Sequence, residues 1–456
     1  MDYDAIIVGS GQAGVPLAVR LAEAGRRVLI IEKGSFGGTC VNTGCTPTKT
    51  LVASARAAHV ARCAGRLGVT VGRVDVDFAA VMARKDAIVR RWREGVERRL
   101  GSQPERLQVL RGHARFVATD TLEVDGARHR APLIVINTGA RPVLPELPGL
   151  DAAACLTNES ALDLRELPRR LLVLGGGYIG CELAQMFRRL GSEVAVIYRA
   201  EHLLDREDVD TSGALERAFD DEGIERLSSS RVERAARSAA GVELRLVGGR
   251  SLEGSHLLVA TGRRPNSDDL GLERAGIALD RRGFVQVDDD YRTTAAGVYA
   301  VGDVTGGPQF THASWDDHRR LLAALERPGT GRRGARIVPY TVFTDPEVAG
   351  VGLSENEARA RGVPFEVATL AFGDVARAIE TDETHGTLKV LIDPASERIL
   401  GCRLVGSQAG ELVHVFVVLM QAGASARAIV DAEFVHPTLG EGVQSLVRRL
   451  PRYSGS

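Results

Sequence analysis

Two cysteines stand close together near the start of the 456-residue sequence. Cys40 and Cys45 enclose four residues in the stretch GGTCVNTGCTPTK, and a helical pattern follows Lys49. A thiolate at a helix N-terminus is stabilised by the helix dipole and by unsatisfied backbone N–H groups, so its pKa falls and its reactivity rises. The spacing also allows one thiol to lie beside a flat cofactor while the other faces outward. The pair therefore indicates redox chemistry.

Zinc binding and a structural disulfide are the competing interpretations of this pair. A zinc site needs about four ligands, and no second Cys/His pair has finger or ribbon spacing. We expect a cytoplasmic protein, because the N-terminus MDYDAIIVGSG lacks the basic region and cleavage site of a signal peptide. A reducing compartment disfavours a permanent disulfide. We therefore expect a redox-active pair and no metal site, with buried apolar roles for the remaining cysteines, which are Cys63, Cys155, Cys181 and Cys402.

The composition excludes several classes of partner. Lysine and arginine number 58 and aspartate and glutamate 59, so no net field attracts nucleic acid or an anionic membrane. The longest apolar stretches, such as LVHVFVVLM, are far shorter than the roughly 20 residues that span a bilayer. We expect a protein of several domains with no nucleic-acid or membrane partner.

A glycine turn follows the first apolar stretch. Gly9, Gly11 and Gly14 have the spacing G-x-G-x-x-G between a predicted strand and a predicted helix, and Glu32 ends the next strand. This context makes the glycines a dinucleotide-binding fingerprint. Glycine allows the backbone to approach a pyrophosphate, the helix N-terminus attracts its charge, and the acid accepts hydrogen bonds from a ribose.

The same pattern recurs in the middle of the chain. Gly175, Gly177 and Gly180 lie between the strand LLVL and another helix, and both intervals end in related turns, INTGARP and VATGRRP. We interpret this as an internal duplication. The sequence therefore predicts an α/β fold with two Rossmann-like dinucleotide-binding domains, a long helix over 78–100, and a C-terminal α+β region for packing or association.

These motifs resemble those of the class I pyridine nucleotide-disulfide oxidoreductases, the family of glutathione reductase, dihydrolipoamide dehydrogenase and mercuric reductase. The likeness covers essentially the whole chain, from the first fingerprint through C-x-x-x-x-C-x-P-x-K to TGRRPN and HPT-x-x-E. It implies FAD at the first fingerprint and NADH or NADPH at the second. It also implies a homodimer with an active site shared between the subunits, and four domains: FAD-binding (1–147), NAD(P)-binding (148–265), central, completing the FAD site (266–334), and interface (335–456).

The resemblance implies a role for each matched residue. Cys45 would lie next to the flavin and Cys40 would attack the substrate. Lys49 would lie near the flavin, with Glu182 as its acidic partner across the nicotinamide site. The FAD-binding residues would be Gly9, Gly11, Gly14, Glu32, Gly38, Thr39, Lys49, Thr138, Gly139, Gly302 and Asp303. The NAD(P)-binding residues would be Gly175, Gly177, Tyr178, Gly180, Glu182, Arg199 and Gly262.

The C-terminal FVHPTLGEG supplies an acid–base pair. The resemblance implies that His436 reaches the other subunit's disulfide and that Glu441 orients its ring. Histidine titrates near neutrality, so it can accept a proton from Cys40 and return it to a leaving thiol. His312 and His318 are expected on a helix surface or near a cofactor, without a catalytic role.

Coenzyme choice depends on the end of the second unit's last strand. An acid there would repel a 2′-phosphate, but the strand runs into Tyr198 and Arg199, and arginine binds phosphate well. NADPH is therefore favoured. Gly180, which is the NAD-like form of the third glycine, and Asp205, where glutathione reductases carry a second arginine, favour NADH.

The predicted function is an FAD-dependent NAD(P)H:disulfide oxidoreductase acting on a small-molecule disulfide or dithiol. The first alternative is a reductase of Hg(II) or Cu(II), because the wording of several motifs is closest to mercuric reductase paralogues. His436 and the absence of a cysteine pair in the terminal PRYSGS argue against mercury. A non-catalytic NAD(P)H-binding flavoprotein is the second alternative, and it would need neither the cysteines nor the histidine.

Overall fold

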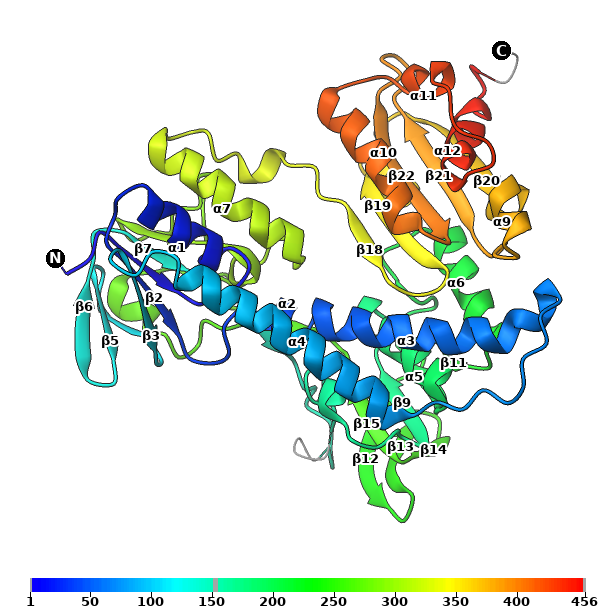
Figure 1. Ribbon diagram of the computed structural model, residues 1–456, viewed down its shortest axis with the longest axis horizontal. Helices are drawn as coiled ribbons and strands as arrows, with labels where there is room; N and C mark the ends of the chain where they lie inside the picture. Colours follow the sequence, from blue (N-terminus) through cyan, green and yellow to red (C-terminus); the bar gives the residue numbers. More distant parts are fainter. Residues whose placement is uncertain (1, 151–154, 454–456) are drawn as a thin grey trace. The chain divides into compact units, whose positions relative to one another are not determined.

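The computed structural model describes residues 2–150 and 155–453 (Figure 1). Residues 1, 151–154 and 454–456, which belong to three of the predicted domains, lie outside the described residues. The chain forms two compact units. The first comprises residues 1–50, 82–143 and 262–336, and the second 51–81, 144–261 and 337–456. The division into four domains stays a prediction.

The first unit is built on a parallel sheet with the strand order β17-β7-β1-β2-β3. All four residues of β1 are buried, because strands of a parallel sheet are covered on both faces. Ala5 and Ile7 pack on the face covered by α1 and α7, whereas Ile6 and Val8 pack toward the antiparallel sheet β4-β5-β6. In Figure 1, α1 and α7 lie side by side.

The strands of the first unit are β1 (Ala5–Val8), β2 (Val28–Glu32), β3 (Leu107–Arg111), β4 (Arg115–Ala118), β5 (Thr121–Val124), β6 (Ala127–Arg130), β7 (Ile134–Ile136), β8 (Ala140–Pro142), β16 (Arg263–Pro265) and β17 (Val298–Ala300). Its helices are α1 (Gly14–Glu23), α2 (Gly38–Asn42) and α7 (Thr311–Glu326), together with the first residues of α3 (Cys45–Cys63) and most of α4 (Phe78–Leu100).

The second unit contains another parallel sheet, with the order β11-β10-β9-β15. Its strands are β9 (Arg170–Leu174), β10 (Glu193–Ile197), β11 (Glu225–Leu227) and β15 (His256–Val259), with helices α5 (Tyr178–Leu190) and α6 (Val209–Asp221). A small antiparallel sheet, β12 (Val232–Ser238), β13 (Gly241–Leu246) and β14 (Ser251–Gly254), shares one hydrophobic core with it. This is the expected repeat of strand, glycine turn, helix and strand.

The C-terminal part of the second unit is an antiparallel sheet with the order β18-β19-β22-β21-β20. Helix α10 lies against β19 and β22, and α12 lies against β20 and β21 (Figure 1). The strands are β18 (Tyr340–Val342), β19 (Glu347–Gly352), β20 (Glu366–Ala371), β21 (Thr387–Ile392) and β22 (Ile399–Gly406). The helices are α8 (Glu355–Ala360), α9 (Ala376–Glu380), α10 (Ala409–Ala422), α11 (Arg427–Asp431) and α12 (Leu439–Arg448).

A buried ion cluster links this sheet to the second nucleotide-binding fold. Lys389 on β21 donates to Asp208 at 3.2 Å, Asp210 at 2.8 Å and Glu355 at 3.1 Å. The carboxylate of Asp208 also accepts the backbone N–H groups of Glu355 and Asn356, which begin α8. Hydrogen bonds from backbone and ammonium groups satisfy the buried charges of Asp208 and Lys389, as a dry interior requires, whereas Asp210 is partly exposed.

The fold agrees with the α/β prediction. The helix predicted over 78–100 is α4, with the same bounds, and the strands TLKVLI and ILGCRLVG are β21 and β22. Across the described residues, no helix combines the length and the apolarity needed to cross a membrane.

Candidate active site

The first glycine turn is held by close contacts that exclude side chains. Gly9 has φ +104°, and a Cβ atom there would lie 2.3 Å from the carbonyl oxygen of Asn137. A Cβ atom at Gly14 would lie 2.1 Å from the carbonyl oxygen of Gly9, and one at Gly11 3.0 Å from Oδ1 of Asn137. Because these positions have no room for side chains, the backbone of the turn is accessible at the N-terminus of α1. Such a backbone suits a pyrophosphate.

A buried asparagine braces this turn. Asn137 follows β7 and is 6% exposed. Its Oδ1 accepts the N–H of Gly14 at 2.9 Å, and its Nδ2 donates to the carbonyl oxygen of Val301 at 3.1 Å. The side chain thus ties the start of α1 to the residue before Gly302. The predictions named its neighbours Thr138 and Gly139 and missed Asn137, although it stands in the INTG turn.

Glu32 is oriented at the end of β2. Its Oε2 accepts from the backbone N–H and hydroxyl of Ser10, at 2.9 and 2.7 Å, and its Oε1 accepts from the N–H of Gly34 at 2.7 Å. Because Oε1 accepts only one of these bonds, it keeps a lone pair for a further donor. The carboxylate therefore fits the predicted contact with a ribose diol.

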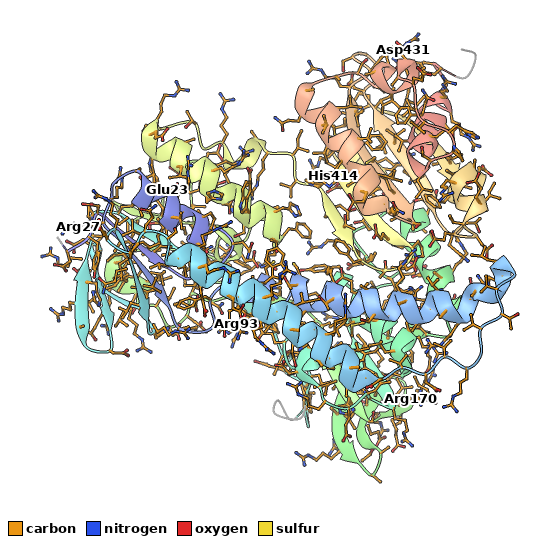
Figure 2. The ribbon with its side chains drawn as sticks, in the orientation of Figure 1. Glu23, Arg27, Arg93, Arg170, His414 and Asp431 are labelled. Carbon is orange, nitrogen blue, oxygen red and sulfur yellow. The ribbon has the colours of Figure 1, made fainter. Side chains whose placement is uncertain are left out.

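Cys40 and Cys45 lie on two consecutive helices and are present as thiols. The helical pattern predicted after Lys49 belongs to α3, which begins earlier, at Cys45. Cys45 is exposed, whereas Cys40 lies in the short helix α2 and is half-buried. Asn42 fastens α2 by donating to the carbonyl oxygens of Phe36 and Gly38. Arg93, which is labelled on α4 in Figure 2, donates to Oδ1 of Asn42 at 2.9 Å.

The two thiols do not hold their protons equally. The hydrogen bond with Cys45 and then burial raise the pKa of Cys40 well above its usual range, and Thr311 and Lys49 act in the opposite direction. Lys49 lies one turn after Cys45 on α3. The net effect favours the protonated form of Cys40. That asymmetry suits two thiols with different roles.

The glycine–aspartate turn after β17 is anchored by α7. Oδ2 of the buried Asp317 accepts the N–H of Gly302 at 2.7 Å, and its Oδ1 accepts the hydroxyl of Tyr291 at 2.9 Å. Burial raises the pKa of Asp303, and Arg263, 4.0 Å away, opposes the rise. The buried Nε of Arg263 has no hydrogen-bond partner among the described residues. The first unit therefore offers a cradle and an unsatisfied donor that fit a phosphorylated cofactor such as FAD.

The second glycine turn repeats the backbone of the first. Gly175 has φ +122° and its Cβ atom would lie 2.4 Å from the carbonyl oxygen of Ala260, while that of Gly180 would lie 2.0 Å from the carbonyl oxygen of Gly175. A Cβ atom at Gly177 would meet nothing within 4 Å. The turn leads into α5, whose first residue, Tyr178, is 37% exposed.

The residues after β10 differ from those after β2. Tyr198 occupies the place of Glu32 and is 4% exposed, and Arg199 after it is exposed. Gly262, in the matching turn after β15, has φ +139°. The described surface after β10 thus presents a cation where the first unit presents an anion.

Glu182 is buried on α5, not on the helix surface. It is 5% exposed, and its Oε1 accepts the N–H of Phe343 at 2.9 Å. A cavity of about 150 Å³ in the second unit is lined by Glu182, Met186 and Phe343, with Gln185 and Asp345 among the others. A buried carboxylate beside a cavity is typical of a functional site.

His436 and Glu441 form the predicted pair. Glu441 Oε2 lies 2.8 Å from Nδ1 of His436, and the histidine side chain is 68% exposed. Thr438 caps α12 by accepting the N–H of Glu441 at 3.2 Å. In a full capping box, as at Ser354 and Glu357 of α8, the glutamate side chain also accepts a hydrogen bond from the N-cap backbone N–H. Glu441 instead holds the histidine ring, which leaves Nε2 for proton exchange.

Several secondary expectations need correction. His318 is 5% exposed and its ring contacts the carbonyl oxygen of Trp315, so it does not lie on the helix surface, whereas His312 is exposed. Cys181 and Cys402 are fully buried as predicted, but Cys63 and Cys155 are only half-buried. Within residues 2–150 and 155–453, no cluster of three or more metal-ligating side chains occurs.

Comparison with known proteins agrees with this geometry. Residues 3–317 match the sequence model of the pyridine nucleotide-disulphide oxidoreductase family, and residues 338–447 match that family's dimerisation domain. The chain belongs to this family. Its members depend on FAD and use NAD(P)H, so the protein is a flavoprotein oxidoreductase acting on sulfur groups. The dimerisation domain supports a homodimer.

Three relatives illustrate the range of similarity. The solved structure of the HOCl-induced flavoprotein disulfide reductase RclA from Escherichia coli is 36% identical with a TM-score of 0.89, covering 98% of this chain and 99% of that one. Dihydrolipoyl dehydrogenase of Thermus scotoductus is 35% identical, covering 98% of this chain and 97% of its own. Mercuric reductase of Lysinibacillus sphaericus is 34% identical, covering 97% and 82%.

Proposed function

We propose that the protein is an NADPH-dependent reductase of a small-molecule disulfide, acting in the cytoplasm as a homodimer with shared active sites. The observation that carries the proposal is the pairing of His436 with Glu441 at 2.8 Å. Disulfide reduction needs a proton donor for a leaving thiolate, and an oriented histidine provides one. Reduction of a metal ion has no such requirement.

The proposed cycle uses the two thiols in turn. Bound FAD supplies the two-electron path from the nicotinamide to the Cys40–Cys45 disulfide. Cys40, once its proton has passed to the partner subunit's His436, attacks one sulfur of the substrate and forms a mixed disulfide. The first product leaves as a thiolate and takes the proton back. The thiolate of Cys45 then attacks the sulfur of Cys40, which restores the disulfide and releases the second product as a thiolate that takes a proton from solvent.

Arg199 supports NADPH as the coenzyme. It is exposed directly after β10, and a guanidinium binds a 2′-phosphate through two hydrogen bonds. Tyr198 replaces the acid that would repel that phosphate. We therefore propose NADPH over NADH.

The test combines a spectrum with a substrate panel. Anaerobic reduction with NADPH should produce a thiolate-to-flavin charge-transfer band that is absent from the Cys45→Ser variant. Turnover should then be measured with glutathione disulfide, lipoamide, other small disulfides, Hg(II) and Cu(II). We expect disulfide turnover, lowered by about 10²-fold or more in His436→Ala. Hg(II) or Cu(II) turnover without any disulfide turnover, unchanged in His436→Ala, would refute the proposal.

Metal-ion reduction is the second candidate. A solved structure described as a Cu(II) complex of RclA is 35% identical to this chain with a TM-score of 0.90, and a mercuric reductase is 34% identical. The same panel separates the two functions, because only the disulfide reaction should depend on His436.

A further inference from the structure

The hydroxyl of Thr311 lies beside the redox pair. Its Oγ1 is 3.2 Å from Sγ of Cys45, and it also hydrogen-bonds with Cys40. Thr311 belongs to α7, more than 260 positions from Cys45 along the sequence, so only the fold of the first unit brings them together.

Thr311 does not cap its own helix. Threonine hydroxyls at helix starts usually accept a backbone N–H from the N-cap position, as Thr438 does on α12. On α7 the N-cap is Phe310, which has no side-chain cap, and Thr311 is the first helical residue. Its hydroxyl is therefore directed to the two sulfurs, and the uncapped positive end of a 16-residue helix lies next to them.

Asp317 holds α7 in this position. It lies on the same helix as Thr311, and its carboxylate accepts the N–H of Gly302 and the hydroxyl of Tyr291. Arg336 forms an ion pair with it. Because Asp317 is 2% exposed, these bonds are shielded from water and fix the helix start.

We propose that Thr311 is a positioning residue for the dithiol, and that its hydroxyl donates to the sulfur of Cys45 once that sulfur carries the negative charge. This inference rests on the proposed function, since it concerns the reduced Cys40–Cys45 pair. Reduction of the S–S bond of this pair needs two electrons, which FAD would supply, and takes up one proton. The charge then remains on Cys45 and the proton on Cys40.

Two groups near the pair favour a negative charge on its sulfurs, namely Lys49 and Thr311. Lys49 on α3 acts on Cys40 and stabilises a negative charge at the pair. A thiolate can only accept hydrogen bonds, so the Thr311 hydroxyl must donate to it. Hydrogen bonds to charged groups are stronger than those between neutral groups. The hydroxyl therefore stabilises a thiolate at Cys45, from which it lies 3.2 Å away.

The experiment compares Thr311→Val with Thr311→Ser in the holoenzyme. Valine keeps the shape and removes the hydroxyl, whereas serine retains the hydroxyl. The charge-transfer absorbance of the two-electron-reduced enzyme is titrated with pH. In Thr311→Val we expect about a tenfold lower thiolate-to-thiol ratio at a fixed pH, so the band appears at higher pH. Thr311→Ser should return the titration toward the wild-type curve.

A second measurement tests the role of Thr311 independently of the proposed function. The alkylation rate of Cys45 in the reduced protein is followed against pH, with Cys40 resolved by peptide mass spectrometry. Its profile should move to higher pH in Thr311→Val only. An unchanged profile in Thr311→Val, or no recovery in Thr311→Ser, would overturn the role of Thr311. Loss of the band in the wild type would instead overturn the proposed function, and alkylation would still test Thr311.

Discussion

The first and second glycine turns have the same backbone arrangement, but different side chains surround them. In both, the first glycine lies under a carbonyl oxygen of the neighbouring strand, that of Asn137 in one turn and Ala260 in the other. The Asn137 side chain then braces the first turn, whereas alanine offers nothing equivalent to the second. One duplicated frame thus supports a tightly held site and a more open one.

The two turns also differ at the position where the first unit has Glu32. Glu32 is held by Ser10 and Gly34, while its counterpart Tyr198 is buried and followed by the exposed Arg199. The second unit instead has a charged brace outside the turn, where Lys389 meets Asp208. The stabilisation by the neutral side chain of Asn137 should not depend on pH, whereas that by the charged pair of Asp208 and Lys389 should. This difference makes the comparison testable.

The largest effect should come from alanine at the first glycine of either turn. Gly9→Ala and Gly175→Ala each combine a positive φ with a Cβ atom within 2.4 Å of a carbonyl oxygen. We expect Gly9→Ala to lose FAD, measured as the ratio of absorbance at the flavin band to protein absorbance. Gly175→Ala should keep FAD and lose reduction by NADPH. Equal loss of flavin in both variants would contradict the assignment of one dinucleotide to each turn.

The charged brace should give a large and pH-dependent effect. Although burial opposes its ionisation, the N–H groups of Asn356 and Glu355 and the ammonium of Lys389 lower the pKa of Asp208. Its contribution is therefore present above the unfolded-state pKa and is lost as the pH falls through the lower folded-state value. Asp208→Asn should lower the free energy of unfolding at pH 7 by about 3 kcal/mol.

Urea denaturation at several pH values measures this prediction. The difference between wild type and Asp208→Asn should begin to shrink as the pH falls below about 4, where the carboxylate of the unfolded chain becomes protonated, and should vanish once the pH has passed the lower folded-state pKa. Asp205→Asn serves as the matched control, because Asp205 is exposed in the preceding loop. A difference that stays constant with pH would show that packing, not charge, carries the effect.

The neutral brace should contribute somewhat less. Asn137→Ala leaves the buried N–H of Gly14 and the carbonyl oxygen of Val301 without these partners. We expect the apoprotein to lose about 2 kcal/mol of unfolding free energy, with no change in that loss between pH 5 and 8. FAD should also dissociate faster, which release of flavin fluorescence would measure. A strong pH dependence of the stability loss would be unexpected for an amide.

We expect the smallest effects from substitutions at Arg199 and Gly177, near the second glycine turn. Arg199→Ala should raise the KM for NADPH about tenfold and leave that for NADH unchanged, because only NADPH carries the 2′-phosphate. Gly177→Ala should leave stability within about 0.5 kcal/mol of wild type, since its Cβ atom meets nothing within 4 Å. Steady-state kinetics with both coenzymes and thermal unfolding provide these values. An equal rise in both KM values for Arg199→Ala would argue against phosphate recognition.

Local patterns account for what the sequence predicted well. The two fingerprints, the helix over 78–100 and the helical run after Lys49 depend on glycine spacing, apolar periodicity and helix signals, which act between near neighbours. The pairing of His436 with Glu441 also lies within five residues, so a motif suffices to propose it.

The sequence analysis did not predict the roles of residues whose partners lie far away along the chain. Asn137, Asp317 and Thr311 carry no periodic signal, and each gains its partners from other segments of the first unit. The burial of His318 and the partial exposure of Cys63 likewise depend on which neighbours cover them. Burial is a property of packing, and a single side chain does not determine it.

The sequence by itself therefore determined the family, the two nucleotide-binding frames and the identity of the reactive sulfurs, because these follow from residue types at short spacing. Only the tertiary structure decided which thiol keeps its proton. The hydrogen bond with Cys45 and the burial of Cys40 raise the pKa of Cys40, whereas Thr311, which α7 brings to 3.2 Å from Cys45, lowers it. Proton affinity responds to solvent exclusion and to hydrogen bonds between distant segments, and both exist only once the chain has folded.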